Sequence, residues 1–455
     1  MSCSSFTRSE VVRHQVAVAG RGLPAIEAGM PVPAGTGLTR REMVVRGFAA
    51  GLTVYGASRL GVGALEEGIA TAAVGAPGAP VLVSIFLPGG LDGLSVLAPV
   101  GDARYRTLRP QLALAEGEGG AFTEDPRLMW APAAAGLQTL HAEGKVSVAP
   151  AIGYADADQS HFTSRHFWEV GATDASARHG WLGRYLDAHG SAENPLQGLS
   201  LAGSLSPALA TAVNPVAAVD RIDDFDLWAP GVGGDVAGAL FEAIGGLGRL
   251  PTTDPQRRSA RAVAARLDGI RRSLGPFQAQ GSTPGFLSPV PYPSTDFGRR
   301  LAGLGALLGA GLPLRAVTLD APGGYDTHAD QAATLAGDLR ETCEGVLAFQ
   351  RDLEARGQAG RVVVLLWSEF GRRPAENQTG TDHGAGGVGF VVGARARGTM
   401  LGEFPGLATL DSDENLRSTV DFRSIYCGLL EEHFGVDAAP LVPGAASFAR
   451  MPLLR

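Results

Sequence analysis

Five continuous apolar runs along the chain predict strands that are buried on both faces. They are Val81–Leu87, "KVSVAPAIGY", "LRAVTLD", "RVVVLLW" and "GVGFVVGA". Helical patterns lie between them, in "AAGLQTLHAEG", from Ser160 through Trp168, in "HGWLGRYLDAHG", at 235–248 and 256–274, and from Gln331 to about Arg356. Strands that alternate with helices predict an α/β fold with a mostly parallel central sheet flanked by helices.

Polar side chains follow four of these strands. Ligands of open α/β sheets bind beyond the carboxyl ends of the strands, so we expect the polar clusters to converge on one site. The segment "SEFGRRPAENQTGTDHG", Ser368 to Gly384, is predicted to be a loop that forms one wall of this site. In chain order the clusters are Asp92, then Ser160 and His161, then Asp326 and His328, and finally Glu369 with Asp382 and His383.

The acids and histidines of these clusters predict a metal site. Asp326 and His328 are two residues apart, so an extended segment points both to one side. A carboxylate oxygen and an imidazole nitrogen together suit a divalent metal. Asp382 and His383 could share a metal where the chain turns. We therefore predict one or two divalent ions, with zinc, manganese and calcium all open. The alternative for each cluster is a capping or turn-forming acid beside a solvent-exposed histidine.

Ser160 and His161 stand at a predicted helix start, where backbone N–H groups favour an anionic group. We therefore predict Ser160 and His161 as catalytic residues, with Arg372 or Arg165 clamping an anion. The alternative is an N-cap serine and a packed histidine. The chain has no Gly-x-Ser-x-Gly segment, so an α/β-hydrolase nucleophile elbow is not indicated.

The N-terminal segment resembles a twin-arginine export signal. Arg40 and Arg41 precede a weakly apolar stretch rich in glycine and alanine, which ends near Ala70-Thr71-Ala72. The alternative is an ordinary amphipathic helix with a chance Arg-Arg pair. Met30 would leave ten residues before the arginines and is a second candidate start. We predict a leader at 1–78, a single α/β domain at 79–455 with an insertion around 195–300, and a periplasmic or extracellular location without a stable membrane span.

Composition narrows the class of protein. The 455 residues are 45% hydrophobic, which is enough for a large core, and the net charge of -8 without a basic stripe argues against nucleic-acid binding. The three cysteines form no Cys-x-x-Cys pair, which excludes a zinc ribbon and a thioredoxin-like redox site. Cys343 and Cys427 lie in helical patterns, so we expect buried thiols.

Six ordered blocks resemble the secreted bacterial family catalogued as domain of unknown function 1501. The blocks are "FLPGGLDGLSVLAPVGDARYRTLRP", "SHFTSRHFWEVG", "GWLGRYLD", "YDTHADQ", "SEFGRRPAENQTGTDHG" and "TVDFRSIYCGLLEEHFG". The family is grouped with the alkaline phosphatase and sulfatase superfamily, so the resemblance implies a three-layer α/β sandwich. It also implies Asp92 as a metal ligand, Ser160 as nucleophile, Asp326 with His328 on one metal, and Asp382 with His383 on the other.

The chain departs from the superfamily pattern in three places. The spacing from Asp326 to His328 is shorter than in alkaline phosphatases, the last expected histidine has only His433 as a candidate, and Glu369 has no obvious counterpart. The resemblance implies a secreted metal-dependent hydrolase of phosphate or sulfate esters, acting on an anionic small molecule or a glycan. The alternatives are a secreted binding or surface-assembly protein with a vestigial metal site, and hydrolysis of a non-ester glycan or lipid bond.

Overall fold

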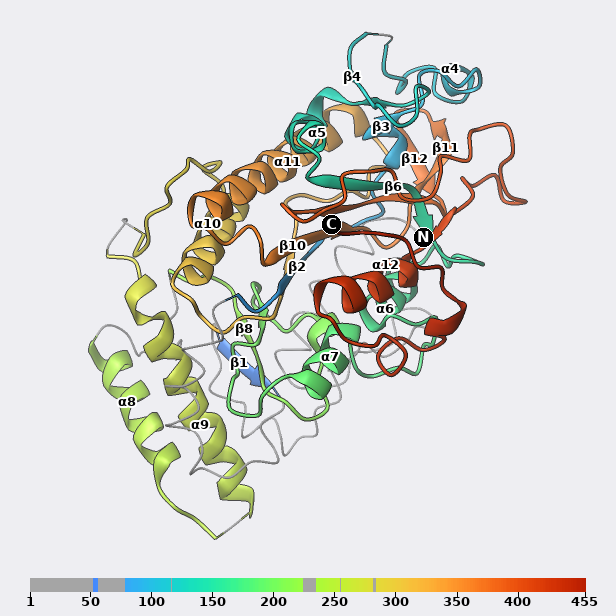
Figure 1. Ribbon diagram of the computed structural model, residues 1–455. Coiled ribbons are helices and arrows are strands. Elements are labelled where there is room, and N and C mark those ends of the chain that lie inside the picture. Colours follow the sequence, from blue (N-terminus) through green and yellow to red (C-terminus); the bar gives the residue numbers. More distant parts are fainter. Residues whose placement is uncertain (1–51, 56–77, 116, 224–234, 254, 281–283) are drawn as a thin grey trace. The chain divides into compact units, whose positions relative to one another are not determined.

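A computed structural model describes residues 52–55, 78–115, 117–223, 235–253, 255–280 and 284–455 (Figure 1). The chain forms two compact units. Unit 1 comprises the described residues within Met1–Val81, Asp174–Pro289 and Ala302–Leu319, and unit 2 comprises those within Leu82–Thr173, Val290–Leu301 and Asp320–Arg455. Met30, Arg40, Arg41 and Ala70–Ala72 lie outside the described residues. The leader and the domain boundary at residue 78 therefore stay predictions.

The five predicted strands are confirmed, and four of them form the core of unit 2. The order there is β2 (Val81–Phe86), β10 (Val362–Trp367), β13 (Gly387–Val392), β6 (Val146–Gly153) and β14 (Val420–Asp421). All residues of β2, β10, β13 and β6 are buried, which explains their continuous apolar sequences. β13 runs antiparallel to both β10 and β6, whereas β14 is parallel to β6.

Helices cover both faces of these strands (Figure 1). On one side lie α5 (Ala135–Ala142) and α11 (Gln331–Ala355), and on the other lie α6 (His161–Val170) and α12 (Phe422–Gly428). The Trp168 ring of α6 stacks on the Trp367 ring of β10, with centroids 5.3 Å apart. Unit 2 therefore has the predicted three-layer α/β arrangement. The thiols of Cys343 and Cys427 are buried and unbridged, as expected.

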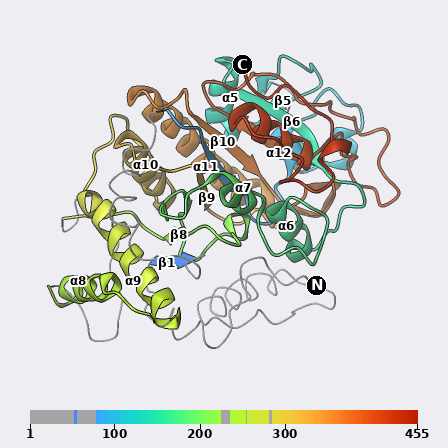
Figure 2. The same ribbon diagram turned by 60° about the horizontal axis from the view of Figure 1, so that its bottom comes forward.

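Unit 1 contains its own strands in the order β1 (Leu52–Tyr55), β8 (Val216–Val219), β7 (Gly198–Ser200) and β9 (Ala316–Asp320). β7 pairs in parallel with β8 and β9, and β1 pairs antiparallel with β8. The predicted helices are present as α7 (Trp181–His189), α8 (Asp235–Arg249) and α9 (Pro255–Leu274). α8 and α9 lie side by side in both views (Figure 2). α10 (Asp296–Gly309) was not predicted from the sequence.

The polar segment after β10 is not the loop that the sequence suggested. It holds a hairpin, β11 (Arg372–Asn377) and β12 (Gly380–His383), in which Arg372 pairs with His383. Smaller elements complete unit 2: β3 (Leu97–Ala98), β5 (Met129–Trp130), β4 (Gly120–Ala121), α4 (Tyr105–Leu108), the 3₁₀ turns Gly93–Ser95, Pro132–Ala134 and Ala445–Ser447, and a π turn at Leu429–His433. In unit 1, 3₁₀ turns span Pro207–Leu209 and Gly275–Phe277. Within the described residues, no helix combines the length and apolar content needed to cross a lipid bilayer.

Candidate metal centre

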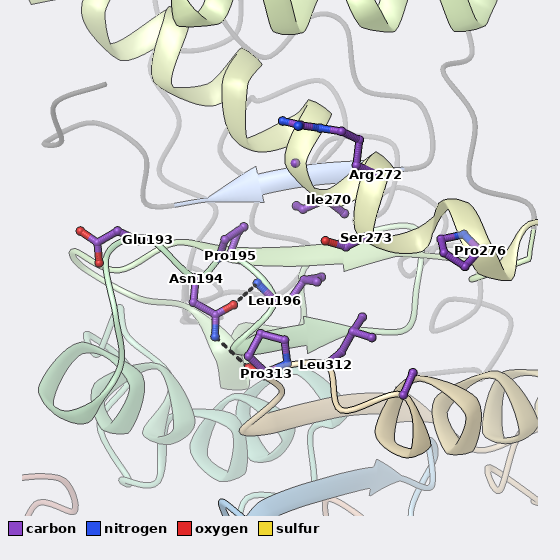
Figure 3. A pocket seen from close by; sticks show the side chains of 12 residues that line it. Glu193, Asn194, Pro195, Leu196, Ile270, Arg272, Ser273, Pro276, Leu312 and Pro313 are labelled. Atoms are coloured by element: carbon purple, nitrogen blue, oxygen red, sulfur yellow. Dashed lines mark hydrogen bonds between the residues drawn. The ribbon is translucent and has the colours of Figure 1, made fainter. Parts of the chain in front are cut away.

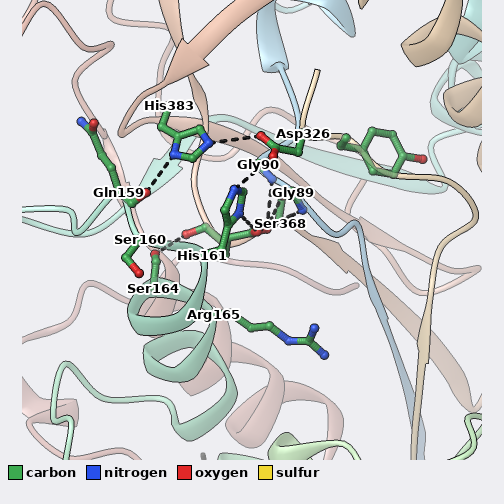
Figure 4. A network of polar contacts seen from close by, with 12 residues as sticks. Gly89, Gly90, Gln159, Ser160, His161, Ser164, Arg165, Asp326, Ser368 and His383 are labelled. Carbon is green, nitrogen blue, oxygen red and sulfur yellow. Dashed lines mark hydrogen bonds and ion pairs between the residues drawn. The ribbon is translucent and has the colours of Figure 1, made fainter. Parts of the chain in front are cut away.

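Three side chains from distant parts of unit 2 converge at the edge of its strands. They are His161 at the start of α6, Asp326 in the segment after β9, and His383 at the end of β12 (Figure 4). One nitrogen or oxygen atom from each lies within 4.8 Å of the other two. Asp326 Oδ1 is 3.1 Å from His383 Nε2, and Asp326 Oδ2 is 3.5 Å from His161 Nε2. Two imidazole nitrogens and one carboxylate form a donor set that fits a divalent metal ion.

The backbone fixes which nitrogen of His383 faces the aspartate. His383 Nδ1 lies 2.9 Å from the carbonyl oxygen of Gln159, and a carbonyl can only accept. Nδ1 therefore carries the hydrogen. Burial lowers the pKa of His383, and the charges of His161 and Arg372 lower it further against the opposing effect of Asp326. The neutral ring then directs the Nε2 lone pair at the Asp326 carboxylate, an arrangement that a cation between them would stabilise.

A buried carboxylate orients His161 in the same way. Glu369 Oε1 lies 2.7 Å from His161 Nδ1, and the Glu369 side chain is fully enclosed. Burial favours the neutral form of Glu369, but the hydrogen bond and charge of His161 and backbone N–H donors lower its pKa on balance. His161 therefore donates from Nδ1 and presents Nε2 to Asp326. Burial alone would lower the pKa of His161, but its contacts with Asp326 and Glu369 raise it to about 9.

Two glycines after β2 hold Glu369 in place. The backbone N–H of Gly89 donates to Glu369 Oε1 and Oε2 over 3.0 and 3.2 Å, and that of Gly90 donates to Oε2 over 3.1 Å. Their φ angles are +112° and +76°, which favour glycine. A Cβ on Gly89 would overlap the Asp326 backbone, and one on Gly90 would overlap the Phe370 ring. Gly89 and Gly90 thus allow the backbone to come close enough to donate hydrogen bonds to the buried Glu369 carboxylate that contacts His161.

His328 lies on the more exposed side of this group, next to His383 and Asp326. Its Nε2 is 3.0 Å from both His383 Nε2 and Asp326 Oδ1, and its side chain is 32% exposed. Asp382 is further out, with a side chain that is 54% exposed and Oδ1 lying 3.4 Å from His328 Nδ1. The structure thus places Asp382 behind His328 rather than within the three-residue group.

Asp92, predicted to be a metal ligand, lies apart from this group. Its buried carboxylate forms an ion pair with Arg109, with Nη1–Oδ2 and Nη2–Oδ1 distances of 2.5 and 2.9 Å. Ser95 Oγ and Gln331 Nε2 donate to Oδ2 over 2.5 and 2.6 Å. Burial opposes ionisation, yet the charge and hydrogen bonds of Arg109 lower the pKa of Asp92. This carboxylate is already neutralised by a guanidinium, so its role here is structural.

Arg372, predicted to clamp an anion, is surrounded by oxygens of the protein itself. Its guanidinium is completely buried and donates to the backbone oxygens of Gly90, Thr381, Gly89 and Tyr325. Its Nη2 also lies 2.5 Å from Asp326 Oδ1. The residue therefore holds Asp326 and the surrounding loops in position. Arg165, the other predicted clamp, pairs with Glu169 over 2.8 Å and lies over the Phe86 ring.

Ser160 occupies the N-cap position of α6, as the sequence predicted, but makes no side-chain cap hydrogen bond. Its backbone N–H donates to Asp158 Oδ1 over 2.7 Å. In Figure 4 its side chain points away from Asp326 and His383.

His433 is buried in the π turn and does not belong to the three-residue group. The sequence analysis did not identify the contact between Gln159 and His383, because a residue of any type can supply a backbone carbonyl oxygen.

Comparison with known proteins matches one part of the chain to a family and indicates no function. No curated protein matches the sequence significantly. Two solved structures are similar in outline: the crystal structure of Ps i-CgsB, at 10% identity and TM-score 0.35, and its complex with k-i-k-neocarrahexaose, at 9% identity and TM-score 0.34. Each alignment covers 80% of this chain and 74% of the other. These scores are too low to transfer an activity or a ligand.

The family match covers most of the candidate site. Residues 245–429 match the model of a family described as "Protein of unknown function (DUF1501)". The matched segment contains Asp326, His328, Glu369 and His383, whereas His161 lies before it. The grouping with the alkaline phosphatase superfamily stays a prediction. The resemblance to the family is confirmed for this part of the chain: residues 245–429 match the model of the DUF1501 family, whose function is unknown.

Proposed function

We propose that this protein is a metal-dependent hydrolase whose centre is formed by His161, Asp326 and His383. The observation that carries the proposal is the orientation of the two imidazoles. Each is fixed through Nδ1 by a buried or backbone oxygen, and each directs Nε2 toward the Asp326 carboxylate. Histidine ligands of catalytic metals are commonly held this way by an acceptor on the other nitrogen.

Three protein ligands with an accessible side are typical of a catalytic rather than a structural metal site. The accessible side here carries His328, which is about one-third exposed. Two imidazole nitrogens favour zinc or manganese over calcium, which prefers oxygen ligands. A divalent ion held by His161, Asp326 and His383 would supply Lewis acidity, which would make water a stronger nucleophile and offset charge on an ester oxygen.

The residues around the centre have separate roles in this proposal. Glu369 holds the ring of His161, the Gln159 carbonyl holds the ring of His383, and Arg372 holds Asp326. Phosphate or sulfate esters of a small molecule or a glycan remain the proposed substrates, on the resemblance to the superfamily. Because Arg372 is enclosed, the negative charge of such a substrate would have to be balanced mainly at the metal.

An assay with p-nitrophenyl phosphate and p-nitrophenyl sulfate, together with metal analysis, tests the proposal. The wild-type protein should hydrolyse at least one ester when loaded with zinc or manganese, and His161→Ala should abolish turnover. The matched control is His179→Ala, because His179 is exposed and outside the group. A protein that binds metal but hydrolyses neither ester would support the binding-protein alternative. Equal turnover in His161→Ala and His179→Ala would contradict the proposed centre.

We also propose export by the twin-arginine route to the periplasm or beyond. The support is the Arg40-Arg41 pair before a weakly apolar stretch that ends near Ala70-Thr71-Ala72. The double variant Arg40→Lys, Arg41→Lys should leave the full-length precursor in the cytoplasm. Normal export and processing of that variant would show that the pair is not the signal.

A further inference from the structure

The backbone group that holds His383 is itself held by a buried amide. Gln159 accepts a hydrogen bond from His383 Nδ1 at its carbonyl oxygen over 2.9 Å, a contact that Figure 4 shows. The side chain of Gln159 donates from Nε2 to Asn415 Oδ1 over 3.2 Å, although the two residues are 256 positions apart. Asn415 is 2% exposed, so water does not readily replace this contact. The His383 ring is therefore linked through Gln159 to the interior of unit 2.

The Asp411 carboxylate determines which way the Asn415 amide faces. Burial opposes ionisation of Asp411, but hydrogen bonds from Asn415 and from the Asp413 N–H lower its pKa on balance. An ionised carboxylate can only accept, and Asp411 Oδ2 lies 3.1 Å from Asn415 Nδ2. Asn415 Oδ1 therefore faces Gln159, which must donate. Donors and acceptors are thus in a fixed order from Asp411 to the His383 ring.

The loop 411–416 is closed on itself and attached to the segment that follows β12. Asp411 Oδ1 accepts from the N–H groups of Asp413 and Asn415 over 2.9 and 2.7 Å, and the Asp411 N–H donates to the Asn415 carbonyl over 3.0 Å. The Leu416 carbonyl accepts from the Gly386 N–H over 3.0 Å. One hydrogen-bonded loop therefore contacts both the residue that accepts from the imidazole and the chain just after the imidazole.

We propose that Asn415 is a positioning residue for His383, the proposed metal ligand. Its amide holds Gln159, so the Gln159 carbonyl stays on His383 Nδ1 and the ring keeps its Nε2 lone pair directed at Asp326. Loss of a partner behind a metal-bound histidine weakens metal binding by about 10- to 100-fold, and Asn415 acts one contact further away. The effect on metal affinity rests on the proposed function, whereas the position of the hydrogen on His383 does not.

A buried asparagine in unit 1 supplies the matched control. Asn194 is 7% exposed and lines a cavity in that unit (Figure 3). It donates from Nδ2 to the Pro313 carbonyl over 2.8 Å and accepts from the Leu196 N–H over 3.1 Å. Asn194→Leu and Asn415→Leu each remove a buried amide with two side-chain hydrogen bonds, so both should lower stability. Only Asn415→Leu should change the His383 ring.

Nitrogen-15 NMR of the metal-free chain, labelled at histidine, locates the hydrogen on His383. Burial and neighbouring charges lower the pKa of His383, so the ring is neutral at about pH 8. The wild type and Asn194→Leu should carry the hydrogen on Nδ1 alone, whereas Asn415→Leu and Gln159→Met should show both tautomers. Gln159→Met keeps the backbone carbonyl and tests the contact even if Asn415→Leu does not fold. A single Nδ1–H tautomer in Gln159→Met would overturn the inference.

Competition with a chelator measures the effect on metal binding. Zinc affinity should fall about tenfold in Gln159→Met and in Asn415→Leu, and stay at the wild-type level in Asn194→Leu. The double variant Gln159→Met, Asn415→Leu should lose no more than either single variant, because both remove the same contact. Wild-type affinity in both single variants would overturn the positioning role. A wild type that binds no zinc, with both tautomers in Gln159→Met, would overturn the proposed metal centre and support the hold of Asn415 on His383.

Discussion

His161 Nδ1 lies 2.7 Å from Glu369 Oε1, although the two residues are 208 positions apart in the sequence. The Glu369 carboxylate accepts further hydrogen bonds from the N–H groups of Gly89 and Gly90. It is therefore fixed before any ligand arrives, and the imidazole that it holds is fixed with it. These contacts support a positioning role for Glu369 in the proposed centre, whereas the sequence suggested that it was a metal ligand.

Glu369→Gln should weaken metal binding by about 10- to 100-fold, because an amide holds the imidazole N–H less strongly than a carboxylate does. Competition with a chelator measures the affinity. Glu344→Gln, on the exposed face of α11, is the matched control and should bind metal like the wild type. Wild-type metal affinity in Glu369→Gln would mean that the carboxylate does not position a ligand of the metal.

Asp92→Asn should destabilise the fold by about 3–5 kcal/mol, because it leaves the buried Arg109 guanidinium without its counter-charge. Metal content should stay at the wild-type level, since Asp92 lies outside the three-residue group. Chemical denaturation and metal analysis of the same preparation measure the two quantities. A loss of metal from a variant that remains folded would return Asp92 to the set of ligands predicted from the sequence.

The lowered pKa of Asp92 also predicts how the stability of the protein changes with pH. Burial opposes ionisation of Asp92, but Arg109 and its hydrogen bonds bring its pKa below the ordinary value of 3.8. A lowered folded-state pKa contributes stability that is complete above about pH 4 and is lost as the pH falls further. The free energy of unfolding of the wild type should therefore decrease below pH 4 more steeply than that of Asp92→Asn. Parallel curves for the two proteins would exclude this contribution.

Ser160→Ala should reduce turnover by less than about tenfold, because the Ser160 side chain points away from Asp326 and His383 in Figure 4. In the proposed mechanism water is the attacking group, so we expect the Ser160 hydroxyl to be dispensable. Single-turnover kinetics with the better of the two p-nitrophenyl esters measure the effect. A loss of several orders of magnitude at unchanged metal content would establish Ser160 as the nucleophile that the sequence suggested.

The five long strands could be predicted because each is an apolar run that the structure buries, completely in β2, β6, β10 and β13 and up to the exposed Asp320 in β9. The hairpin β11–β12 could not, because its residues are mostly polar. It is held by tertiary contacts of single side chains, such as that from Arg372 to the Thr381 carbonyl. Local pattern carries no information about such contacts.

The convergence of three of the predicted residues could also be anticipated from the sequence. His161, Asp326 and His383 follow or precede strand ends, so topology alone brings them toward one edge. The roles of the two buried acids could not be read from the sequence. Asp92 is neutralised by Arg109, only 17 residues away, whereas Glu369 meets His161 from 208 residues away. Which acid meets a cation and which orients a ligand depends on the folded arrangement.

Metal stoichiometry across four variants tests the centre most directly. After equilibrium dialysis against zinc or manganese, the wild type should hold at least one ion per chain, and His161→Ala, Asp326→Asn and His383→Ala should each lose it while remaining folded. Asp382→Asn should retain most of the metal, because Asp382 stands behind His328. Full occupancy in both His161→Ala and His383→Ala would contradict a centre formed by these residues.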